Sequence, residues 1–360
     1  MHTISTPARS YALTNNQAMG VIMTTGHVTT HLVRGLMGTG KTTLLKGIGE
    51  ALGYPTFYFD CTVKDLPDLA LPDMQNSTDC LRMIESEQLG KHIDGPVVVC
   101  IDELGKAPKQ LANGLMATML ERDGYHPDSI IFATSNLGVE GLGDMFLPHQ
   151  LNRLTAWEMR SPDAMEWIEW GINNGVVHEV LGWVKDTPQV LQDFRDVSDP
   201  NENEYINHPQ AAGRTQVCTP RSLKKASDII KAGAGKLDNH TLTAALIGTI
   251  GPRGAMDLMS HLKLSSQLPT LDAIKADPTG AMVPTNASAT CMVVFRSLMA
   301  LERDWCDAWM TYMCRLSKEA QALFVNQANQ PTYEHRSMIA QNKQFTDWCL
   351  NNNYMFGVDS

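Results

Sequence analysis

Apolar runs without alternation recur along the first 160 residues, separated by segments in which apolar residues follow helical spacing. The clearest run, 97–101, is apolar at every position, which indicates a strand covered on both faces, as in a parallel sheet. Four other short segments predict strands over 31–34, 56–60, 129–134 and 154–159. The intervening segments predict helices over 17–25, 41–52, 77–92 and 106–122. We therefore predict an α/β fold with a five-stranded parallel sheet between helices.

From residue 161 onward the apolar spacing is helical. Thr219-Pro220-Arg221-Ser222-Leu223 opens another helix, and Gly251-Pro252 is expected to interrupt a later one. A methionine and tryptophan stripe near the end of the chain indicates a core or a subunit interface. Its members are Met299, Trp305, Trp309, Met313 and Leu316. The predicted helices are 164–173, 176–186, 241–264, 291–326 and 335–351. The predicted domains are 1–160, 161–268 and 269–360.

Composition narrows the classes of partner. The net charge of −10 gives no broad positive surface for nucleic acid, although a local basic loop stays open. The eight cysteines show no C-x-x-C spacing, which argues against a zinc site and a disulfide framework, so we expect reduced thiols and a cytoplasmic location. No apolar run approaches the roughly 20 residues that span a bilayer. The first ten residues lack the apolar centre of a signal peptide, so no membrane association is expected.

The candidate chemistry begins at the loop after the first predicted strand. It satisfies the pattern G-x-x-x-x-G-K-[ST] between a strand and a helix. Glycines allow successive backbone N–H groups to turn toward phosphate oxygens, and the helix N-terminus adds a positive end. Lys41 would contact the β and γ phosphates, and Thr42 would offer its hydroxyl to Mg²⁺. The predicted nucleotide-binding residues are Gly35, Leu36, Met37, Gly38, Thr39, Gly40, Lys41, Thr42 and Thr43.

Two carboxylates, Asp102 and Glu103, end the apolar run that begins at residue 97. The carboxyl ends of strands in an open α/β sheet are where ligands bind. We expect Asp102 to hold Mg²⁺ and Glu103 to orient the attacking water or accept its proton. The alternative is a surface pair that caps the next helix.

Three further polar residues follow the carboxylates. Asn136, after the fourth strand, could bind the γ-phosphate or the attacking water, and the alternative is an asparagine in an ordinary turn. Arg153 could reach the γ-phosphate of a neighbouring subunit or be a solvated loop arginine. Arg221 lies in the first turn of a helix, where it opposes the helix dipole, which indicates an anion to bind.

Taken together, these motifs resemble the AAA+ ATPases over residues 15–265. The loop 35–42 is similar to Walker A, 97–103 to Walker B, Asn136 to sensor 1, Arg153 to the arginine finger and Arg221 to sensor 2 on a helical lid domain. Leu-Pro-x-x-x-Asn-Arg at 147–153 and the Pro-Arg lid helix most resemble the MoxR-type branch of bacteria and bacteriophages. The chain departs from that branch at Leu154, where an aromatic residue is usual, and at Gly-Leu-Met-Gly in place of Gly-x-Pro-Gly.

The resemblance implies a homo-oligomeric ring, a hexamer, or a related open spiral, with ATP and Mg²⁺ bound between subunits. Hydrolysis would move the lid domain, 161–268, and remodel a protein partner, for which a von Willebrand factor A domain protein is the first expectation. The role of a helical C-terminal extension, 269–360, is left open. The alternative is a DNA-directed motor or loader, which the acidic charge disfavours. A small-molecule kinase fits the Asp-Glu strand poorly.

Overall fold

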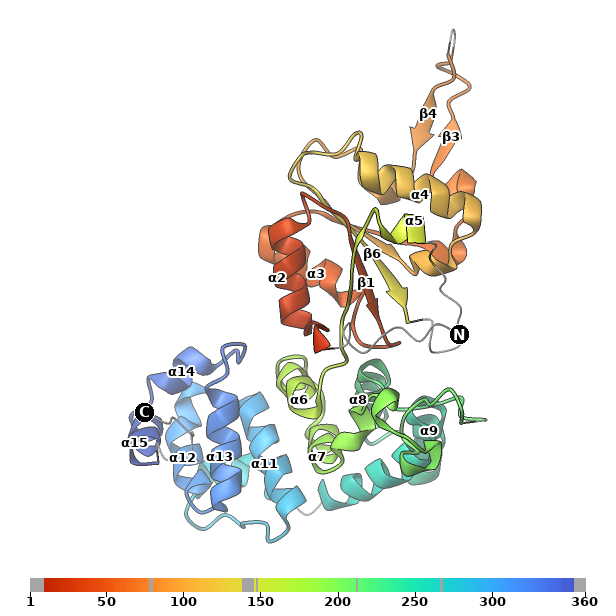
Figure 1. Cartoon of the computed structure of the whole chain (residues 1–360). Helices are drawn as coiled ribbons and strands as arrows, with labels where there is room; N and C mark the ends of the chain where they lie inside the picture. Colours follow the sequence, from red (N-terminus) through yellow and green to blue (C-terminus); the bar gives the residue numbers. More distant parts are fainter. Residues whose placement is uncertain are drawn as a thin grey trace. The chain divides into compact units, whose positions relative to one another are not determined.

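The computed structural model describes residues 10–77, 80–137, 146, 148–211, 213–265 and 268–352. The chain divides into two compact units, Met1–Ser161 and Pro162–Ser360, and each has its own hydrophobic core. Within the described residues the strands all belong to the first unit, and the second unit is helical (Figure 1).

A five-stranded parallel sheet forms the centre of the first unit, in the order β2-β5-β6-β1-β7. Every residue of β5 and β6 is buried, as their continuous apolar runs predict. All five predicted strands are confirmed. Their bounds are β1 (His31–Gly35), β2 (Thr56–Asp60), β5 (Val98–Asp102), β6 (Ile130–Asn136) and β7 (Thr155–Glu158).

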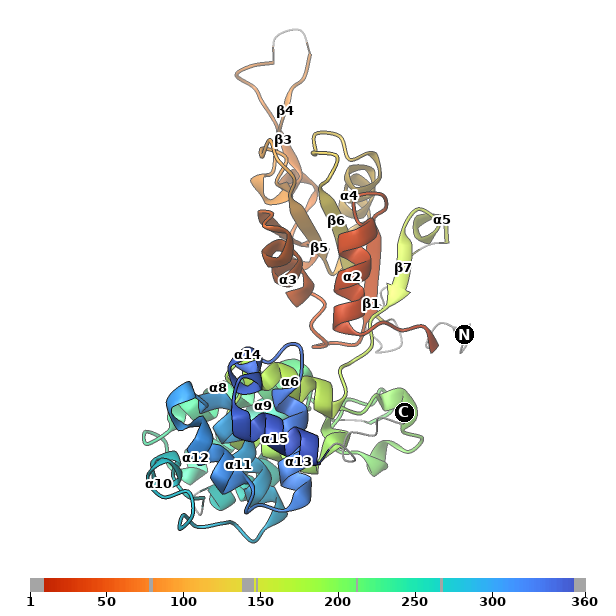
Figure 2. The same ribbon diagram turned by 90° about the vertical axis from the view of Figure 1, so that its left-hand side faces the viewer.

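Helices cover both faces of this sheet. On one face, α2 (Asn15–Thr25) and α3 (Thr43–Leu52) pack onto apolar residues of β1, β5 and β6 (Figure 2). On the other face, α4 (Lys109–Glu121) packs onto the alternate residues of the same strands. These three helices confirm the predicted ones, with α4 starting later because Pro108 and a short 3₁₀ turn (Leu104–Lys106) precede it.

The helix predicted over 77–92 is wrong. The chain instead forms an antiparallel hairpin of β3 (Ala70–Pro72) and β4 (Met83–Glu85), which projects from the sheet in both views (Figures 1 and 2). Leu81 and Ile84 have helical spacing, but their exposed fractions are 66% and 59%, so no apolar stripe is buried to stabilise a helix. The Asp73 carboxylate accepts hydrogen bonds from the backbone amides of Gln75 and Asn76. These bonds start a turn in place of a helix.

Helices of the second unit pack around one core. The predicted stripe is confirmed as core, since Trp305, Trp309, Met313 and Leu316 are buried and Met299 is partly so. The helices are α6 (Ala164–Asn173), α7 (His178–Asp186), α8 (Pro220–Gly233), α9 (Asn239–Ser265), α10 (Leu271–Ala276), α11 (Ala287–Ala300), α12 (Cys306–Met313), α13 (Lys318–Ala328), α14 (Arg336–Ala340) and α15 (Lys343–Asn351).

Two breaks in this helical unit have local causes. Gly251 interrupts α9 as predicted, with φ of 80°, and an added Cβ there would lie 2.5 Å from the carbonyl oxygen of Gln216. The segment predicted as helical over 291–326 is helical but consists of three helices. The last of them starts afresh because the Ser317 side chain accepts a hydrogen bond from the Ala320 amide.

The division of the second unit at residue 268 stays a prediction. No helix in the described part of the chain combines the length and the apolar character that crossing a membrane requires.

Trp309 lets us test the core of the second unit. It is fully buried against the rings of Trp305, Tyr312 and Phe324, and its indole N–H has no hydrogen-bond partner. We expect Trp309→Ala to lower the free energy of unfolding by about 3–5 kcal/mol, measured by urea denaturation. Trp309→Phe should cost less, about 1–2 kcal/mol, because it also removes an unpaired donor. Trp170→Ala, at a 43% exposed tryptophan, should change stability by about 1 kcal/mol or less. Equal losses for all three variants would contradict this view of the core.

Candidate nucleotide-binding site

The loop between β1 and α3 has the backbone shape of a phosphate cradle. Gly38 and Gly40 have φ of 71° and 94°, in the left-handed region that side chains disfavour. Two threonines brace the loop from within, since Thr39 Oγ1 donates to Leu36 O at 3.0 Å and Thr43 Oγ1 donates to Gly40 O at 2.6 Å. The loop can therefore present backbone amides to an anion at the N-terminus of α3.

Lys41 is 6% exposed and lies under the loop. Its ammonium donates to Gly35 O at 2.9 Å, to Leu36 O at 2.8 Å and to Asn136 Oδ1 at 2.9 Å. The Asn136 bond joins the loop to the end of β6, because Gly35 and Asn136 are register partners in neighbouring strands. These three oxygen acceptors hold the ammonium beneath the loop, where a phosphate could bind it.

Asp102 ends β5 and accepts hydrogen bonds from three hydroxyl groups. Thr42 Oγ1 donates to Asp102 Oδ2 at 3.2 Å, and the Tyr58 phenol donates to the same oxygen at 2.7 Å. Thr134 Oγ1 donates to the other oxygen, Oδ1. Sequence reasoning missed Tyr58 and Thr134. A signal for Thr134 existed, because it lies two residues before Asn136 and so on the same face of that strand.

Glu103 adopts a left-handed backbone conformation, with φ of 54° and ψ of 40°. Its amide donates to Thr134 Oγ1 at 3.2 Å, and its two carboxylate oxygens accept from Asn136 Nδ2 at 2.9 and 2.8 Å. Lys106 Nζ lies 2.9 Å from Glu103 Oε2. A non-glycine residue in this region is strained, and such strain is concentrated at functional sites.

Two cysteines near the site are not suited to act as nucleophiles. Burial, followed by the charges of Asp60, Asp102 and Glu103, raises the pKa of the Cys61 thiol to about 12. Burial raises the pKa of Cys100 well above its usual value. Both thiols are therefore protonated at neutral pH and are poor nucleophiles. Burial and the hydrogen bond to Asp102 also raise the pKa of the Tyr58 phenol, which remains a donor.

The oxygen atoms of Thr42 and Asp102 fit Mg²⁺, which prefers hard oxygen ligands. Because the Thr42 hydroxyl directs its proton to Asp102, its lone pairs are left for a metal ion. The structure therefore brings Lys41, Thr42, Asp102, Glu103 and Asn136 together at the carboxyl ends of β1, β5 and β6.

The other two predicted site residues are arginines. Arg153 follows α5 (Pro148–Leu151), its side chain is exposed, and its guanidinium has no partner among the described residues. Leu147, the first residue of the motif that contains Arg153, lies outside the described residues. Arg221 is exposed in the first turn of α8, in the second unit, as predicted. The roles of both arginines stay predictions.

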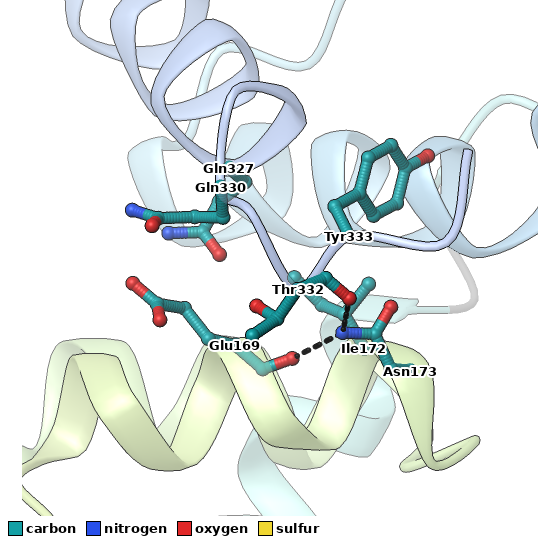
Figure 3. A pocket seen from close by; sticks show the side chains of 7 residues that line it. All are labelled: Glu169, Ile172, Asn173, Gln327, Gln330, Thr332 and Tyr333. Carbon is teal, nitrogen blue, oxygen red and sulfur yellow. Dashed lines mark hydrogen bonds between the residues drawn. The ribbon is translucent and has the colours of Figure 1, made fainter. Parts of the chain in front are cut away.

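A small hollow in the second unit has a different character (Figure 3). Asn173 of α6 joins its two sides, donating to Glu169 O at 3.2 Å and to Thr332 O at 2.9 Å. Burial and nearby acidic residues raise the pKa of the Glu169 carboxyl. With a carboxylate and no lysine or arginine in its lining, this hollow does not suit a triphosphate. Its lining residues are Glu169, Ile172, Asn173, Gln327, Gln330, Thr332 and Tyr333.

Comparisons with known proteins give a family match over part of the chain and solved structures at low identity. Solved structures similar to this chain include the Holliday junction branch migration motor RuvB of Thermotoga maritima and a mutant of it. Each shares 14% identity, with 69% of both chains covered and TM-scores of 0.35 and 0.36, values too low to support an argument about activity. No curated protein matches the sequence. The model of the ATPase family associated with various cellular activities (AAA) matches residues 31–150, a segment of the first unit that includes the loop and the acidic strand.

Proposed function

We propose that this protein is a Mg²⁺-dependent ATPase of the AAA+ type that works as a homo-oligomeric ring and remodels a protein partner. One observation carries the proposal. A phosphate-loop lysine, a metal-binding oxygen pair, a carboxylate and an amide are linked by hydrogen bonds at one edge of one sheet. Phosphoryl transfer to water needs these groups, since its catalysis is positioning and charge stabilisation.

The chain's own groups divide this work. The loop amides and Lys41 bind the phosphates, with Lys41 exchanging the Asn136 oxygen for phosphate oxygen as acceptor. Thr42 and Asp102 would hold Mg²⁺, which when bound neutralises phosphate charge. Glu103 orients a water molecule and accepts its proton, and the amide of Asn136 holds that carboxylate in place.

The ring and the protein partner are supported by fewer observations than the nucleotide site. The guanidinium of Arg153 is exposed and has no partner among the residues that the structure describes, which is what a finger for a neighbouring site requires. The hexamer, the lid role of 161–268, the contribution of Arg221 and the von Willebrand factor A domain partner rest on the resemblance to the MoxR-type branch alone. The net charge of −10 favours a protein partner over DNA.

Two substitutions separate binding from turnover. We expect Lys41→Ala to lower ATP affinity on the order of 100-fold, because the loop loses its buried ammonium. Glu103→Gln should leave affinity unchanged and lower the hydrolysis rate about 100- to 1000-fold, because the amide cannot accept a proton. Fluorescent-nucleotide titration and phosphate release measure the two quantities. Equal loss of affinity in both variants would contradict the assigned roles.

Arg153 is tested in mixed rings. Arg153→Ala should lower hydrolysis on the order of 1000-fold if the arginine acts on a neighbouring site. Mixing it with Glu103→Gln subunits should restore part of the activity, because those subunits carry intact arginines. Arg82→Ala, an exposed arginine of the same unit, is the control and should hydrolyse ATP normally. If mixing restores nothing, Arg153 is an ordinary loop residue.

The partner class is tested by capture. In the presence of ATP, Glu103→Gln should retain a protein partner, and neither nuclease nor high salt should release it. Lys41→Ala should retain none. Capture that high salt or nuclease abolishes would favour the DNA-directed motor, because phosphate contacts weaken steeply with salt. Mass spectrometry of the retained material identifies the protein.

A further inference from the structure

Tyr58 contacts the candidate metal-binding carboxylate but belongs to none of the motifs in the chain. It lies on β2, the edge strand next to β5, and its phenol donates to Asp102 Oδ2 at 2.7 Å. Its register partner is Cys100, and Asp60 is the partner of Asp102. Tyr58 therefore reaches diagonally across two residues to Asp102, a span that a long aromatic side chain can cover.

The hydrogen bonds leave Asp102 little freedom. Oδ2 accepts from Tyr58 and Thr42, and Oδ1 accepts from Thr134, so both oxygens are held. A carboxylate fixed at both oxygens cannot rotate about its terminal bond without breaking one of these bonds. Its orientation in turn fixes the proton of Thr42, and so the direction of the Thr42 lone pairs.

The Tyr58 side chain is 41% exposed and lies on the edge strand, so its hydroxyl contributes little to the core. Its hydroxyl donates a directed hydrogen bond to the Asp102 carboxylate, and a tyrosine this exposed does not need such a bond in order to fold. The hydroxyl thus acts on Asp102 more than on the fold. Groups that orient metal ligands in this way commonly change metal affinity when they are removed.

We propose that Tyr58 is a positioning residue that orients Asp102 and Thr42 for a divalent cation bound together with a nucleoside triphosphate. This inference rests on the proposed function. It assigns Tyr58 no contact with the reacting atoms. Its effect is on the gain in triphosphate affinity that the cation provides, and nucleotide binding through the loop and Lys41 is independent of it.

The experiment measures affinity for adenylyl imidodiphosphate, a non-hydrolysable triphosphate, in excess EDTA and in saturating Mg²⁺, with the full chain. For Tyr58→Phe we expect unchanged affinity in EDTA and a loss of about ten-fold in the gain from Mg²⁺. Electron paramagnetic resonance with Mn²⁺ should show weaker cation binding by a similar factor. Tyr54→Phe is the matched control, because the Tyr54 hydroxyl has no hydrogen-bond partner in the described part of the same unit.

The outcomes separate the two proposals. If wild-type protein binds the triphosphate with a Mg²⁺-dependent gain and Tyr58→Phe keeps that gain, the role of Tyr58 is wrong and the proposed ATPase stands. If Tyr58→Phe loses affinity in EDTA as well, the hydroxyl supports the fold of the site and the positioning role is wrong. If the wild-type protein shows no triphosphate binding in either condition, both proposals fall.

Discussion

The hydrogen bonds of the Asn136 amide are what join the two halves of the candidate site. Its oxygen accepts from Lys41 and its nitrogen donates to Glu103, so one planar group links the loop after β1 to the carboxylate after β5. This linkage is available because β6 lies between those two strands. A second strand between β5 and β1 would separate the ammonium from the carboxylate by a further strand spacing of about 4.8 Å.

The sequence predicted the strands well because their signal is local. The apolar runs of β5 and β6 indicate burial on both faces, and burial is what the structure shows. The strand order was beyond such reasoning, since it depends on contacts between residues far apart in the chain. The prediction of a helix where the β3–β4 hairpin lies failed for a different reason. Its apolar residues are exposed, so the assumption that helical spacing implies a buried stripe did not hold there.

The site was predictable to the extent that its residues belong to a contiguous motif. Lys41, Thr42 and Asp102 follow from spacing and from the positions of strand ends. Tyr58 could not be found in this way, because a tyrosine in an apolar strand is ordinary and its contact depends on the pairing of β2 with β5. The roles of the two arginines could not be predicted from local pattern either. An arginine finger would act on a neighbouring subunit, and a sensor on a lid domain would act on a nucleotide held by another domain. Neither Arg153 nor Arg221 has a partner within the described residues that could fix its role.

The backbone of Glu103 explains how two consecutive carboxylates can serve one site. In a regular strand, neighbouring side chains point to opposite faces, and by that rule Asp102 and Glu103 would diverge. At φ of 54° the chain leaves the strand conformation at Glu103, and its carboxylate reaches the Asn136 amide, on the same face as Asp102. Such a conformation costs on the order of 1–3 kcal/mol. The bond from the Glu103 amide to Thr134, the two bonds to Asn136 and the contact with Lys106 offset that cost. Glycine would relieve the strain at this position but would carry no carboxylate, so the local strain accompanies the placement of the Glu103 carboxylate beside the Asn136 amide.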